Sequence, residues 1–76
     1  MIYIKANNDL IRIDEFIRAE FSPAPYNNSS LMIVYYVEGT DKYTTSVLSN
    51  ISKNCLELLA EALQNDKKFV DLSKNT

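Results

Sequence analysis

Few side chains in this 76-residue chain could do chemistry. The sequence has no histidine, so no Ser-His or Cys-His pair can form and no metal site can use imidazole. The one cysteine, Cys55, falls on the apolar side of an expected helix, which predicts a packed, unreactive thiol. The one glycine, Gly39, cannot supply a glycine-rich phosphate loop. We therefore predict that the protein is not an enzyme.

The carboxylates that could hold a hard cation are Asp14, Glu15 and Asp41. Neither the Asp14-Glu15 pair nor the segment around Asp41 has the regularly spaced acidic ligands and the glycine of a calcium loop. Carboxylates at solvated turns explain both stretches, so we expect no metal and no cofactor.

Three aromatic side chains, Tyr35, Tyr36 and Tyr43, could stack unpaired bases from neighbouring strands. Such a platform needs a basic rim for the phosphates, and only Arg12 and Lys42 offer positive charge near it. Acidic neighbours oppose them, and the formal net charge is −2. These tyrosines are therefore predicted to pack in the core and across strands, and no nucleic-acid partner is expected.

The stretch 31–37, Leu-Met-Ile-Val-Tyr-Tyr-Val, is apolar at both odd and even positions. A strand of this composition has no solvent-facing side, so both of its sides need a cover. One expected helix covers one side only, which leaves the other to a curled sheet or to another molecule. The residues expected on that contact face are Met32, Val34, Tyr36, Tyr43 and Val47.

A further contact candidate is Tyr26, which lies in the Pro-rich loop composition of residues 22–30. An exposed aromatic side chain in a loop has few core partners and is suited to binding. The competing interpretation is that Tyr26 folds back and pins its own loop.

These surfaces predict a small, non-enzymatic protein–protein interaction module that self-associates as a homodimer through the apolar sheet face. The alternative is a monomeric regulator or inhibitor that binds a different protein through the loop and a strand edge. A single-stranded nucleic-acid binder is a third class, disfavoured by the charge. No membrane partner is expected, since no apolar run approaches about 20 residues. The lone cysteine and the lack of a signal-peptide pattern favour the cytoplasm.

The first elements are predicted to form a strand hairpin over residues 1–13. A two-residue type I′ turn at Asn7-Asn8 sets Ile4 opposite Ile11 and Ile2 opposite Ile13, all on one side.

The competing interpretation makes residues 9–21 an amphipathic helix. The preferred one breaks the chain at residues 14–15 and resumes a strand over 17–22. That strand has two sides, with Ile17, Ala19 and Phe21 inward and Arg18 and Glu20 outward.

A second hairpin is expected over residues 31–48, closed by a turn at 39–42, with Ile33 opposite Leu48 and Val34 opposite Val47. A helix over about 50–65 should begin near residues 49–52 and end at Asn65-Asp66. Its apolar side comprises Ile51, Cys55, Leu58, Leu59 and Ala62. The tail, 66–76, is expected to pack an apolar patch back on the body, formed by Phe69, Val70 and Leu72.

The segment Ile13–Phe21 with its Arg-Ala-Glu-Phe tetrad, a strand ending in Glu38-Gly39-Thr40 and a Leu-rich helix resemble a group of small uncharacterised bacterial proteins. The loop at 22–30 is longer than in that group. The resemblance implies a fold and no activity. We expect a single α+β domain over 1–76, an antiparallel β-meander of about four to five strongly curled strands with one helix packed on one face.

Overall fold

The computed structural model describes residues 1–23 and 29–73 and confirms the α+β class. Six strands and one helix occur in these residues. They are β1 (Ile2–Ala6), β2 (Asp9–Ile13), β3 (Glu15–Ser22), β4 (Ser30–Tyr36), β5 (Thr44–Ser49), α1 (Cys55–Gln64) and β6 (Phe69–Asp71).

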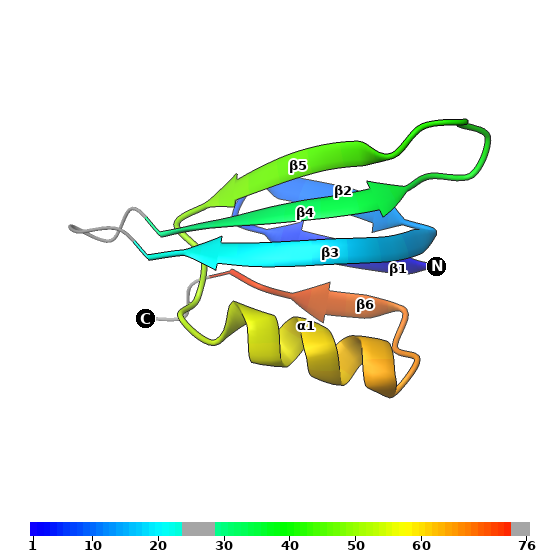
Figure 1. Cartoon of the computed structure of the whole chain (residues 1–76). Helices are drawn as coiled ribbons and strands as arrows, with labels where there is room; N and C mark the ends of the chain where they lie inside the picture. Colours follow the sequence, from blue (N-terminus) through cyan, green and yellow to red (C-terminus); the bar gives the residue numbers. More distant parts are fainter. Residues whose placement is uncertain (24–28, 74–76) are drawn as a thin grey trace.

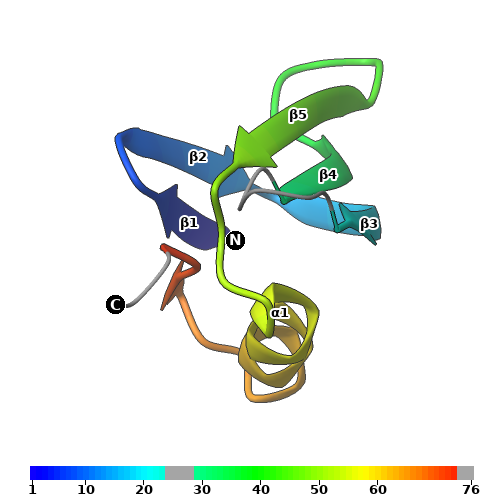
Figure 2. The ribbon, with the colours of Figure 1, turned by 90° about the vertical axis from the view of Figure 1, so that its left-hand side faces the viewer.

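The strands form two three-stranded sheets, with the orders β2-β1-β6 and β3-β4-β5 (Figure 1). The chain passes from one sheet to the other at Asp14, whose backbone N–H donates to the carbonyl of Tyr36 at 3.0 Å. The two sheets lie on opposite sides of the interior, and α1 closes one of the open sides between β3 and β6 (Figure 2). The strands therefore enclose the core through a bend between two sheets, and not through the curling of one continuous meander as predicted.

The N-terminal hairpin has the predicted register, with Ile4 opposite Ile11 and Ile2 opposite Ile13. The helical interpretation of residues 9–21 is wrong, because β2 and β3 occupy them. The turn differs from the type I′ expected: only Asn7 has a positive φ, of 53°, whereas that turn requires positive φ at both central residues.

The predicted strand 17–22 begins earlier, at Glu15, and contains a bulge between Phe16 and Arg18. The extra residue places Ile17 and Arg18 both on the solvent side, while Phe16, Ala19 and Phe21 pack against the core. The inward direction predicted for Ile17 was wrong, because a bulge interrupts the alternation on which that prediction depended.

The hairpin of β4 and β5 has a different register from the one expected. Leu48 lies opposite Leu31 and Val47 lies opposite Met32, two positions away from the predicted partners Ile33 and Val34. The connection spans 37–43 instead of the four turn residues predicted. Because side chains alternate with a period of two, this shift leaves every side chain on the side that was expected.

The helix begins at Cys55, several residues after the predicted start. Ile51 and Ser52 stay outside the helix, because Ile51 forms a bridge with Ser73 and the N–H of Ser52 donates to the carbonyl of Leu72 at 3.3 Å. Tertiary pairing therefore outweighs the helical spacing of Ile51 and Cys55. No helix in the described residues is long and apolar enough to cross a membrane.

The helix ends where predicted, at Asn65 and Asp66. The N–H of Lys67 donates to the carbonyl of Ala62 at 2.9 Å and the N–H of Asp66 to that of Leu63 at 3.4 Å. These two bonds define a Schellman motif, with Asp66 at φ 52°. The motif reverses the chain into β6, a strand that the sequence did not predict and that pairs parallel with β1.

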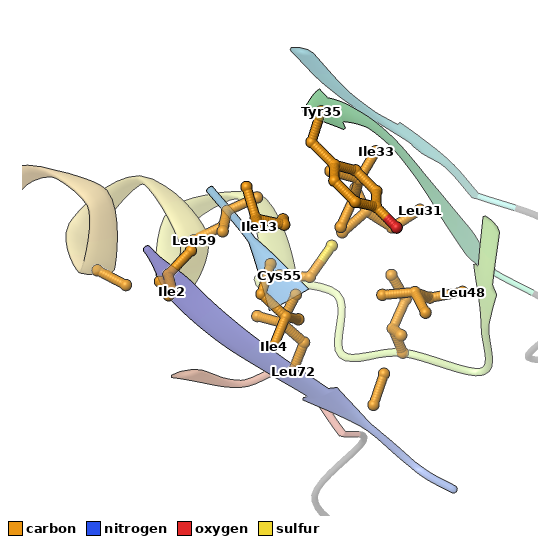
Figure 3. Packing of buried hydrophobic residues seen from close by; sticks show 13 residues of the cluster. Ile2, Ile4, Ile13, Leu31, Ile33, Tyr35, Leu48, Cys55, Leu59 and Leu72 are labelled. Atoms are coloured by element: carbon orange, nitrogen blue, oxygen red, sulfur yellow. The ribbon is translucent and has the colours of Figure 1, made fainter. Parts of the chain in front are cut away.

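The core lies between the sheets and the helix (Figure 3). Its side chains come from both sheets, from α1, from Ile51 before the helix and from Leu72 after β6. The buried set comprises Ile2, Ile4, Ala6, Ile13, Leu31, Ile33, Tyr35, Leu48, Ile51, Cys55, Leu59, Ala62 and Leu72. The Tyr35 hydroxyl is satisfied by the Ser46 hydroxyl at 2.7 Å. One side of β4 is thus fully covered within the chain.

Candidate interaction surface

The other side of β4 faces away from the core. Leu31, Ile33 and Tyr35 point inward, and the side chains between them are only half-buried. Opposite residues of antiparallel strands share a side, so the register places β5 residues with them. We call the resulting set the apolar patch, which comprises Met32, Val34, Tyr36, Tyr43 and Val47. The five residues predicted to form a contact face, four in the sheet and Tyr43 just before β5, therefore lie together.

Direct pairs hold the apolar patch together. Met32 lies opposite Val47 across the β4–β5 ladder. Tyr36 and Tyr43 meet edge to face, with ring centroids 6.4 Å apart and an interplanar angle of 82°. Val47 and Tyr43 are 61% and 63% exposed, so the side of the patch toward β5 is open to solvent. An apolar surface of this kind is available for burial against a partner.

Charged side chains border the apolar patch along β3. Arg18 lies opposite Val34 and Glu20 lies opposite Met32. The Arg18 guanidinium contacts the Glu20 carboxylate at 3.2 Å, and both side chains are more than half exposed. An apolar centre beside a polar border is the arrangement found in protein–protein interfaces.

A second polar group lies where β4 ends. The Asp14 carboxylate accepts hydrogen bonds from the backbone N–H of Glu38 at 2.5 Å and from Arg12 Nε at 3.1 Å. Arg12 also contacts the Glu38 carboxylate at 3.4 Å. The Glu38 N–H, followed by Arg12, lowers the pKa of Asp14, and the bond to Asp14 raises the pKa of Arg12. This cluster fixes the bend between β2 and β3.

Sequence reasoning missed Ile17 as a neighbour of this surface. The bulge turns it outward, where it is 45% exposed. The one available signal was the three-residue spacing of the inward residues Phe16 and Ala19, which strict alternation does not allow. Leu56 and Leu63 were missed as well. They border a groove between α1 and β3 that Phe16 and Ala19 also line.

The residues considered for chemistry are not brought together. Cys55 is fully buried, and the cost of burying a charge raises the pKa of its thiol. Glu15 and Asp41 are exposed. In the residues that the structure describes, no group of three or more His, Cys, Asp or Glu side chains could hold a metal ion. Tyr26, the predicted loop contact, lies outside the described residues.

Comparisons with protein-family models, with curated proteins and with solved structures gave no match. The resemblance to small bacterial meander proteins stays a prediction.

Proposed function

We propose that this protein is a small, non-enzymatic interaction module that self-associates through the apolar patch on the outer side of the β3-β4-β5 sheet. The observation that carries the proposal is the gathering of the five apolar side chains on a side of the sheet that faces away from the core. A two-fold dimer would bury about 800 Å² per partner in an interface of typical size.

Two further features support the proposal. A domain of this length buries only roughly 60% of its unfolded surface, so burial in an interface adds a substantial share of its stability. The lack of histidine and the burial of the only thiol leave few groups for acid–base or nucleophilic catalysis. The single free cysteine also fits a reducing compartment, which supports a cytoplasmic location.

The test places a charge at the centre of the apolar patch. Val34 lies between Arg18 and Thr45 on the outer side, so Val34→Glu should leave the core intact. A carboxylate buried in the interface would lose its hydration, and pairing with Arg18, which lies opposite it, would offset only part of that cost. We expect the dissociation constant of the self-associated species to rise at least tenfold, measured by light scattering over a range of concentrations.

The matched control is Leu10→Glu. Leu10 is 63% exposed on the other sheet, so the same change there should leave association unaffected. The proposal is overturned by a wild-type chain that remains monomeric at all concentrations, or by Val34→Glu associating as tightly as the wild type.

A further inference from the structure

Each sheet has two edge strands, and three of the four are protected against pairing with another chain. β2 and β3 carry charged side chains, and β3 also has a bulge and lies beside α1. β6 is three residues long. Charges, bulges and short length are the devices by which native proteins protect sheet edges.

β5 has none of these devices. Its sequence is Thr-Thr-Ser-Val-Leu-Ser, without charge or proline, and its register with β4 is continuous. In the described residues β5 pairs with β4 alone. An uncharged, regular edge strand of six residues is a template for an additional strand.

The backbone groups that face the free edge can be identified. The N–H of Asn50 donates to the carbonyl of Ser29 at 2.8 Å, in register with the β4–β5 ladder. Antiparallel residues direct both backbone groups alternately toward the partner and away from it. Thr45, Val47 and Ser49 therefore direct theirs to the free edge. The Ser49 carbonyl is already bonded by the Asn7 side-chain amide at 2.8 Å, which leaves both groups of Thr45 and Val47 to be paired.

We infer that the β5 edge is a strand-pairing site and that its occupant is β5 of a second copy of this chain. The two strands run antiparallel about a two-fold axis through Ser46. Thr45 then exchanges both backbone hydrogen bonds with Val47 of the second copy. Val47 does the same with Thr45 of the second copy. The β3-β4-β5 sheets of the two copies then form one continuous six-stranded sheet.

Three features favour a second copy as the occupant. β5 carries no charge, so pairing it with itself sets no like charges opposite each other. In this register Ser49 lies opposite Tyr43 of the other copy, which is outside β5, so strand pairing ends before Ser49 and its bond to Asn7 is kept. An axis through Val47 would instead set Ser49 opposite Thr45, within β5, and compete for that carbonyl. The axis through Ser46 also places Thr45 beside Val47 of the other copy on the outer side, so that the apolar patch continues across the junction.

This inference rests on the proposed function, because it requires the chain to self-associate, but it uses different atoms. The two-fold axis of strand pairing is perpendicular to the sheet, whereas an axis that packs two outer sides together lies parallel to the sheet. Both contacts can therefore occur in one assembly. Each can also be broken separately.

The experiment uses Thr45→Pro. Proline removes an N–H that has no partner within residues 1–23 and 29–73, and it is tolerated on an edge strand whose N–H faces solvent. The apolar patch keeps all five of its side chains. We expect a folded protein by circular dichroism whose association in light scattering is weakened about tenfold or more. The matched control, Thr45→Val, keeps the N–H and the β-branched shape and should associate like the wild type.

Amide hydrogen exchange of the wild-type protein tests the same inference without relying on the variant to fold. The amides of Thr45 and Val47 should exchange fast at low concentration and become protected as association proceeds. The Ser46 amide faces β4, so it should be protected at both concentrations and serves as an internal reference. Fast exchange at Thr45 and Val47 in the associated protein would overturn strand pairing.

The outcomes separate the two proposals. Association that is lost in Val34→Glu but unchanged in Thr45→Pro, with unprotected β5 amides, overturns strand pairing and leaves the patch contact standing. The reverse result supports strand pairing and overturns the patch contact. A monomeric wild type overturns both.

Discussion

Asp14 is the residue whose protonation should most directly affect the fold. Its carboxylate holds the N–H of Glu38 and the side chain of Arg12, and these bonds keep its pKa below the ordinary value of 3.8. A lowered pKa means that the folded state favours the charged form. The resulting stability is fully present above the unfolded pKa and is lost as the pH falls through the folded pKa. Asp71, bonded to the N–H of Ser73, is shifted in the same direction.

We therefore expect Asp14→Asn to lower the free energy of unfolding at neutral pH, with a difference from wild type that shrinks below about pH 4. Urea unfolding at a series of pH values measures this difference. Asp9→Asn removes the same charge from the exposed start of β2 and serves as the control. Parallel pH curves for wild type and Asp14→Asn would show that the bonds to Glu38 and Arg12 contribute nothing specific to the charge.

Asn7 shows how far the sequence predicts a residue's role. Its place in a turn follows from local chemistry, because Asn adopts positive φ more readily than most residues. Its second role is to join the two sheets, through side-chain bonds to the carbonyls of Ser49 and Asn50. That role depends on residues more than forty positions away, and no local pattern indicates it.

At the scale of elements, the end of α1 offers a stabilising change. Asp66 holds a positive φ that costs a residue with a side chain about 1–2 kcal/mol, less for Asp than for most, and its charge lies at the negative end of the helix dipole. We expect Asp66→Gly to stabilise the fold by about 1 kcal/mol, since it removes both costs. Chemical denaturation measures the change in the free energy of unfolding.

The control for this change is Asp66→Ala, which removes the charge but keeps a Cβ at positive φ. It should gain less than Asp66→Gly, or lose stability. An equal gain in the two variants would assign the whole effect to the charge and contradict the backbone argument.

Elements whose structure depends on local sequence pattern were predicted, and those whose structure depends on pairing with distant residues were missed. The first hairpin follows from the alternation of Ile2, Ile4, Ile11 and Ile13 together with a short turn. The β4–β5 register does not follow from alternation, because a shift of two residues leaves each side chain on the same side of the sheet. Only the length of the loop distinguishes the two registers. β6 is short and acquires its strand structure from pairing with β1, which lies at the other end of the chain.

The side of the sheet on which the residues of the apolar patch lie was easier to predict than the division into two sheets, for the same reason. Membership of the apolar patch depends on which side of β4 a residue faces, and that follows from a period of two. The division into two sheets depends on the bend at Asp14, and the exposure of Ile17 depends on a bulge. The bend and the bulge both interrupt the alternation of inward and outward side chains on which the sequence-based prediction depends.

For the whole molecule, self-association makes stability depend on concentration. Because only folded chains associate, each tenfold rise in concentration above the dissociation constant of a dimer adds about 0.7 kcal/mol per chain. A domain of this size gains about 4–8 °C in Tm per kcal/mol. We therefore expect the Tm of the wild type to rise by about 5–10 °C over a hundredfold increase in concentration. The variants Val34→Glu and Thr45→Pro should show a flatter dependence, and Leu10→Glu should follow the wild type. A wild-type Tm that stays constant over that range would mean that the folded chain gains no stability from a second copy, and the outer side of β4 would then have to remain in water.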